Sequence, residues 1–247
     1  MIITPFYAAL AHFLIIVIIG FLPILLKTKH AHFDFFIALG AGVLLSAAFL
    51  HMLPSAIHIL GESAGIYVLL GFLAIFFLEN FTMAHACGEE ACPNHKVGYT
   101  TFFGLSVHSV ISGIALGVGL KSNVATPVAF AMLAAVLIHK VPETLALVVL
   151  LLRSHWSKQK TITFNCLYAC MGPLGILLGN QSVNWLGAHT NNSLGIAVAV
   201  SCGTFLYIAS ADLLPHLHEK EHGHWLKLLG FFIGLLALAF EFGGTAG

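Results

Sequence analysis

Eight apolar runs of about 20 residues dominate this sequence and restrict it to one class of protein. A helix needs about 20 apolar residues to cross the hydrocarbon core of a bilayer. Of the 247 residues, 59% are hydrophobic and only 8% are charged, which leaves too few charges for a solvated surface. The sequence therefore predicts an all-α polytopic membrane protein with eight transmembrane helices, at residues 6–26, 33–53, 65–81, 101–120, 127–152, 162–180, 194–214 and 225–242.

The polar segments between these runs predict how the chain lies in the membrane. They are short, so we expect a single transmembrane domain that spans residues 1–247. Alternate segments carry eight of the ten lysine and arginine residues: Lys27, Lys29, Lys96, Arg153, Lys158, Lys160, Lys220 and Lys227. By the positive-inside rule these segments face the cytosol, so both termini lie outside a plasma (inner) membrane. The formal net charge of +0 argues against a nucleic-acid partner.

An internal repeat links the second and seventh runs. Residues 42–54 and 203–215 lie 161 positions apart and share glycine, leucine, alanine and proline at matching places. The two runs would cross the membrane in opposite directions, as would the fourth and fifth. This pattern predicts an inverted repeat of three helices on each side of a central pair, a 3+2+3 arrangement typical of transporters. The alternative is chance similarity between two helices rich in leucine and alanine.

The fourth and fifth runs contain polar residues that a bilayer core disfavours. A charged side chain at a helix centre costs at least ~2.5–3.5 kcal/mol, so such residues normally mark a functional site. Residues four apart lie on one helix face, which pairs His108 with Ser112. The same spacing pairs His139 with Glu143. Together these groups suit a borderline dication such as Zn²⁺. The alternative is a set of hydrogen-bonded polar residues between packed helices.

Two motifs in these runs resemble the fourth- and fifth-span signatures of the ZIP (ZRT/IRT-like) divalent metal transporters: His108-Ser109-x-x-x-Gly113-x-Ala115-x-Gly117 and His139-Lys140-x-Pro142-Glu143. The resemblance extends over nearly the whole chain. It implies uptake of Zn²⁺, or of Fe²⁺, Mn²⁺ or Cd²⁺, into the cytosol. It also implies a homodimer and an elevator-like movement of the first, fourth, fifth and sixth spans against the others.

The chain departs from the family pattern at its central site. Many members have glutamate where Ser112 stands, and members with two metals have ligands where Ser109 and Lys140 stand. The ammonium group of Lys140 would repel a second dication. We therefore expect a mononuclear site in which Glu143 is the main anion and Lys140 replaces a metal. The alternative for Lys140 is an extended side chain that reaches a lipid headgroup.

Other polar residues mark candidate binding positions outside the central site. His51 and Asp212 occupy equivalent places in the repeat, and we expect them to line the ion's path. The alternative for both is ordinary helix capping or hydrogen bonding. The cytoplasmic segments contain histidine and cysteine residues that would hold metal transiently in a reducing compartment: His85, Cys87, Cys92, His95, His216, His218, His222 and His224. The alternative here is a plain solvated loop.

One segment matches an enzyme motif. His218-Glu219-x-x-His222 fits the H-E-x-x-H pattern of zinc metallopeptidases, in which glutamate acts as the general base. Histidine and acidic residues crowd this segment, so a chance match is easy, and Gly223 follows at once. A membrane metallopeptidase and a metal sensor that does not transport are the alternatives. The sequence favours a zinc uptake transporter that is not an enzyme.

Overall fold

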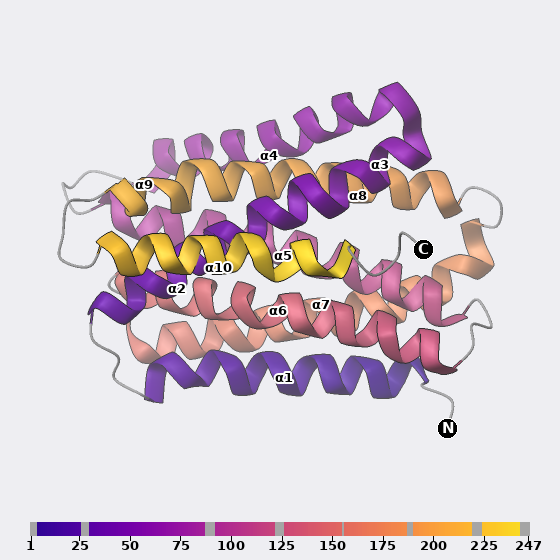
Figure 1. The fold of residues 1–247 in the computed structure, drawn as a ribbon, viewed down its shortest axis with the longest axis horizontal. Coiled ribbons are helices and arrows are strands. Elements are labelled where there is room, and N and C mark those ends of the chain that lie inside the picture. Colours follow the sequence, from indigo (N-terminus) through magenta and orange to yellow (C-terminus); the bar gives the residue numbers. More distant parts are fainter. Residues whose placement is uncertain are drawn as a thin grey trace.

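The protein is a bundle of helices that lie side by side along its long axis (Figure 1). This computed structural model describes residues 4–25, 30–86, 92–121, 126–154, 156–186, 190–218 and 224–242, and it contains no strand among them. The helices are α1 (Pro5–Leu25), α2 (His30–Ser46), η1 (Ala47–Met52), α3 (Leu53–Leu60), η2 (Gly61–Ser63), α4 (Ala64–Ala86), α5 (Cys92–Lys121), α6 (Thr126–Arg153), α7 (Lys158–Leu186), α8 (Thr190–Tyr207), η4 (Ile208–Leu213), α9 (Leu214–His218) and α10 (His224–Phe242).

Six segments of the described residues are long and apolar enough to cross a membrane: Pro5–Leu25, Asp34–Phe81, Gly98–Lys121, Met132–Arg153, Lys158–Ser182 and Asn192–Leu213. Asp34–Phe81 is 48 residues long, and the chain turns within it at Gly61, whose φ of 60° suits glycine. In α10 the shorter segment His224–Ala237 is apolar. These seven segments overlap all eight predicted apolar runs. The prediction of an all-helical membrane protein is confirmed.

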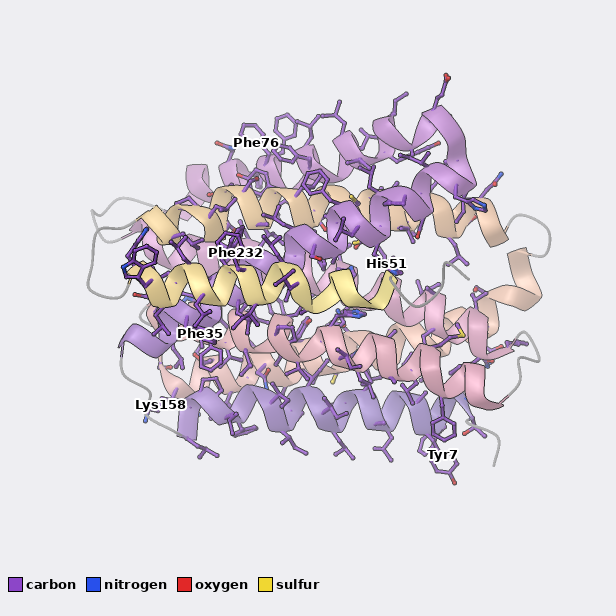
Figure 2. The ribbon with its side chains drawn as sticks, in the orientation of Figure 1. Tyr7, Phe35, His51, Phe76, Lys158 and Phe232 are labelled. Atoms are coloured by element: carbon purple, nitrogen blue, oxygen red, sulfur yellow. The ribbon has the colours of Figure 1, made fainter. Side chains whose placement is uncertain are left out.

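The two ends of the bundle are named after a basic residue at each. We call the end where α3 and α5 finish the Lys121 end, and the end where α6 finishes and α7 begins the Arg153 end. The Lys121 end lies at the right in Figure 1, and Lys158 marks the opposite end in Figure 2. Tyr7, near the Lys121 end, and Phe76 both project outward from the bundle, as apolar side chains of a membrane protein do (Figure 2).

Two π-helical stretches interrupt the second and seventh apolar runs. They are η1 and η4, and they begin 161 positions apart, which is the offset of the sequence repeat. In each, the residue that follows the stretch donates its N–H five positions back: Leu53 to Ala48, and Leu214 to Ala209. A proline comes next in both runs and has no N–H for the helix ladder, which accounts for the local widening.

Glycines bring two pairs of helices into backbone contact. Gly42 of α2 faces the backbone of Phe231 on α10, and Gly203 of α8 faces the backbone of Val68 on α4. Gly42 and Gly203 are equivalent positions of the repeat. α2 therefore packs on α10 in the way that α8 packs on α4. Small residues allow such close approach of helices where no hydrophobic effect drives association.

The remaining long helices form a second packed group of α1, α5, α6 and α7. Gly113 of α5 and Gly175 of α7 meet backbone to backbone. His12 of α1 is fully buried against Gly172 of α7. The contact between Gly113 and Gly175 sets the separation of α5 and α7, and so determines how far the side chains of α7 reach toward α5 and α6.

An ion cluster joins three helices near the Arg153 end. Asp34 of α2 pairs with Arg153 of α6, and its second oxygen lies 3.5 Å from Lys227 Nζ of α10. From the sequence, Lys227 was counted among the basic residues of a cytoplasmic segment, a side of the membrane that stays a prediction. Lys227 lies in the first turn of α10 and is only 2% exposed. A buried ammonium needs a counter-charge, and Asp34 supplies one.

The glycine contacts predict a stability effect. Gly203→Ala should lower the unfolding temperature in detergent, because the added Cβ meets the Val68 carbonyl and forces the α4 and α8 backbones apart. Overpacking of this kind costs about 1–3 kcal/mol. Gly65→Ala is the matched control, since nothing lies within 4 Å of its added Cβ. Equal unfolding temperatures for the two variants would contradict the close contact.

Candidate metal centre

The central polar residues come from α5 and α6 and meet inside the bundle. His108, His139 and Glu143 each offer one ligand atom, and these atoms all lie within 4.8 Å of one another. The imidazole rings of His108 and His139 have centroids 6.0 Å apart. His139 and Glu143 share a face of α6, as the four-residue spacing requires. The structure therefore brings together three of the four residues predicted for the central site.

Two atoms in this group lack hydrogen-bond partners within the described part of the chain. They are His108 Nε2 and Glu143 Oε1, both buried and 3.5 Å apart. A buried polar atom without a partner is costly and calls for an explanation. A cation held between imidazole nitrogen and carboxylate oxygen would satisfy both atoms. This pair is the chemical core of the candidate site.

The other polar atoms of the same side chains are occupied. His108 Nδ1 lies 2.6 Å from Ser201 Oγ of α8. Lys140 Nζ donates to Glu143 Oε2 at 2.6 Å, and the Tyr168 hydroxyl of α7 donates to that oxygen at 3.1 Å. His108 and Glu143 are thus each hydrogen-bonded through one polar atom, while the other polar atom of each side chain is available to a cation. Supporting contacts of this kind orient the ligands of a metal site.

Lys140 and Glu143 form an ion pair with no exposed side-chain surface. The pair lies three residues apart on α6, so the helix carries both charges and no net charge into the bundle. Lys140 does not extend toward a headgroup, because its ammonium points at Glu143 in the protein interior. Ser109, the other position predicted for a second metal, is fully buried on α5.

A cavity of about 350 Å³ reaches the site from one direction. His108 and His139 line its inner part, and Ser55 and Met132 line the part nearer the Lys121 end. Ser112 also lines it, and its hydroxyl donates to the Ser109 carbonyl at 3.2 Å. The hydroxyl would have to release this bond to bind an ion.

The repeat-related residues His51 and Asp212 lie on different sides of the site. His51 lines the cavity, and in Figure 2 it is displaced toward the Lys121 end. Asp212 does not line it. Its carboxylate accepts hydrogen bonds from Thr100 at 3.3 Å and Thr101 at 3.1 Å, near the start of α5 and so toward the Arg153 end. The prediction that both residues line the ion's path stays a prediction.

Packed side chains close the site toward the Arg153 end. The ring of Phe205 on α8 lies 4.0 Å from the His108 ring. Further along, the rings of Trp156 and Tyr99 pack at an angle of 58° with centroids 4.6 Å apart, and Lys160 Nζ lies 3.8 Å from the centre of the Trp156 ring. The cavity and these layers together make the site accessible from the Lys121 end in this conformation.

Most of the predicted cytoplasmic ligands lie outside the residues whose side chains the structure describes: His85, Cys87, Cys92, His95, His216, His218 and His222. The segment His218-Glu219-x-x-His222 that matches the metallopeptidase motif also lies outside the residues whose side chains are described. His224 is described. It begins α10, is exposed, and its ring lies against Trp225 with centroids 6.0 Å apart.

Tyr168, Ser201 and Phe205 contact the candidate ligands but were not predicted from the sequence. All three are neutral residues within apolar runs and belong to no motif that names a metal site. A tyrosine in the middle of a span is one usable signal, because a buried phenol usually finds a hydrogen-bond partner. Nothing in the sequence distinguishes Ser201 from the other serines of the spans.

The amino-acid sequence is similar to those of known zinc transporters. A family model described as "ZIP Zinc transporter" matches residues 2–97 and 85–240. The chain is 24% identical over 249 residues to zinc transporter ZIP9-B of Xenopus laevis, covering 83% of this chain and 82% of that protein. It is 31% identical over 153 residues to human zinc transporter ZIP1, covering 62% of this chain and 46% of that protein.

A third relative is zinc transporter ZIP10 of Danio rerio, 30% identical over 159 residues, or 59% of this chain and 18% of that protein. The family match covers most of the chain, including α5 and α6 with the candidate site. It confirms the resemblance that the two motifs indicated and disfavours the metallopeptidase alternative. The chain belongs to the ZIP zinc transporter family and is a divalent metal transporter rather than an enzyme.

Proposed function

We propose that this protein takes up Zn²⁺ into the cytosol through a single-ion site formed by His108, His139 and Glu143. The observation that carries the proposal is a pair of buried atoms 3.5 Å apart, His108 Nε2 and Glu143 Oε1, which have no hydrogen-bond partner among the described residues, and His108 lines a cavity. Two imidazoles and one carboxylate suit Zn²⁺. Fe²⁺, Mn²⁺ and Cd²⁺ are alternative substrates to be ranked by competition.

The site takes one ion at a time in this proposal. The Lys140 ammonium lies against Glu143, where a second dication would meet a like charge. Ser109, at the other second-metal position, offers no charge. Ser112 offers a hydroxyl where many family members have a carboxylate. The remaining coordination positions would be filled by water or by the Ser112 hydroxyl.

We place the chain in the membrane as one domain of eight crossings in a 3+2+3 arrangement. Asp34–Phe81 would cross twice, turning at Gly61, and α10 would cross once. Three features support the inverted repeat: the offset of η1 and η4, the equivalence of Gly42 and Gly203, and the matched packing of α2 on α10 and α8 on α4.

The basic residues orient this arrangement. The Arg153 end faces the cytosol and the Lys121 end faces outward across the plasma (inner) membrane. The cavity with His51 then receives ions from outside, and Asp212 lies on the side of release. The family resemblance further implies a homodimer and an elevator-like movement of α1, α5, α6 and α7.

The uptake proposal is tested in liposomes or cells that contain the purified or expressed protein. His139→Ala and Glu143→Ala should each abolish Zn²⁺ accumulation while insertion and protein level hold. The matched control is His58→Ala, an exposed histidine outside the cavity lining, which should transport normally. Unchanged uptake in both site variants would show that the ion does not pass through this site.

Removal of the internal cation should change stability and metal response together. Lys140→Met leaves Glu143 as a buried unpaired charge, and breaking such a pair costs about 3–5 kcal/mol. We expect a lower unfolding temperature without metal and a larger upward shift on adding Zn²⁺ than in the wild type, since the dication replaces the ammonium. Lys121→Met, at the bundle end, is the control. A smaller shift in Lys140→Met than in the wild type would argue against ion binding at Glu143.

Metal stoichiometry tests the single-ion claim. The wild-type protein, washed free of loosely bound metal, should retain one ion that depends on His139 and Glu143. Lys140→Asp exchanges the ammonium for a carboxylate, so we expect two central ions in that variant. Elemental analysis of variants that lack the loop histidines would count them. Two site-dependent ions in the wild type would refute the mononuclear assignment.

A further inference from the structure

We propose that Ser201 of α8 is a positioning residue for the ion, and that it holds His108 in the form that binds metal only while α5 lies beside α8. The inference rests on the proposed function, because it assumes that an ion binds at His108 and Glu143. Ser201 belongs to no sequence motif of the site and is fully buried. Its hydroxyl oxygen lies 2.6 Å from His108 Nδ1.

The geometry assigns different tasks to the two ring nitrogens of His108. Nε2 faces Glu143 Oε1 at 3.5 Å and has no hydrogen-bond partner among the described residues, so it is the nitrogen available to a cation. A neutral imidazole that binds a metal through Nε2 carries its proton on Nδ1. That N–H then needs an acceptor, and the Ser201 hydroxyl can accept as well as donate.

The Ser201 hydroxyl is the hydrogen-bond partner of His108 Nδ1 among the described residues. Phe205, four residues further along α8, packs against the His108 ring with centroids 4.0 Å apart and offers no hydrogen-bonding atom. Without the hydroxyl, the Nδ1 proton would be buried against apolar groups. The ring would then turn or change tautomer, and Nε2 would no longer be presented to the ion. Loss of such a support typically weakens metal binding about 10–100-fold.

Ser201 also differs from the other supports in where it comes from. Lys140 lies on α6 and Tyr168 on α7, within the packed group that holds the ligands. Ser201 lies on α8, which packs on α4 in the other group. A movement of α5 past α8 would separate Ser201 Oγ from His108 Nδ1 and leave the remaining supports intact. The ion would then be held more weakly after the movement than before it, which favours its release.

The experiment compares Zn²⁺ uptake kinetics and Co²⁺ binding in the full-length protein, with the Co²⁺ visible absorption spectrum as a report on nitrogen ligation. Ser201→Ala should raise the apparent KM about 10–100-fold and leave Vmax unchanged or higher, since release no longer requires the bond to break. Its Co²⁺ spectrum should show altered ligand-field bands. A general loss of folded protein would instead lower Vmax.

Two further variants separate the hydroxyl from its packing volume. Ser201→Thr and Ser201→Val have the same shape, but only threonine keeps the hydroxyl, so threonine should bind Co²⁺ more tightly than valine. Ser210→Ala is the control on the same chain segment, because Ser210 is exposed and its hydroxyl, within the described part of the chain, donates to the backbone carbonyls of Leu206 and Tyr207.

The outcomes distinguish this inference from the proposed function. Wild-type affinity in Ser201→Ala, or equal affinities in the threonine and valine variants, would overturn the role of Ser201. The proposed site would still stand in that case, provided that His139→Ala and Glu143→Ala abolish uptake. Normal uptake in those two variants would overturn the site itself, whatever Ser201 does.

Discussion

The buried ion pair between Lys140 and Glu143 is the interaction on which the site depends. A charged carboxylate is costly inside a bilayer, and the Lys140 ammonium three residues away on the same helix supplies a counter-charge to Glu143. The pair uses only Oε2, with help from the Tyr168 hydroxyl, and leaves Oε1 open. A neutral pair of charges can therefore be inserted with α6 and still present one anionic ligand atom.

The packing of the helices brings the other ligand to that oxygen. Backbone contact at Gly113 and Gly175 draws α5 and α7 together, so Tyr168 reaches Glu143 while His108 faces it from α5. The related contacts at Gly42 and Gly203 build the opposing group of helices. The candidate site lies where the two groups meet, and the hydrogen bond between Ser201 and His108 joins one group to the other.

The sequence predicted those features that depend on local spacing. Run length predicted membrane helices, and the four-residue periodicity placed His139 and Glu143 on one face. The offset of 161 anticipated two related segments, although it gave no sign that both are π-helical. Contacts between helices distant in the chain were not predictable in this way. The bonds of Ser201 and Tyr168, and the burial of Lys227 beside Asp34, depend on the rotation of each helix in the bundle, which hydrophobic patterns do not define.

The charge balance of the site has a consequence for transport under the proposed function. Lys140 cancels the charge of Glu143, so a bound dication leaves the site with a net charge near +2. A second carboxylate at Ser112 would lower that charge to about +1 and bind the ion more tightly. The membrane potential contributes ~2.3 kcal/mol per charge per 100 mV, so the loaded site of this chain experiences roughly twice that inward drive. Weaker binding and a stronger drive both favour release on the cytosolic side, because a transported ion must leave as readily as it arrives.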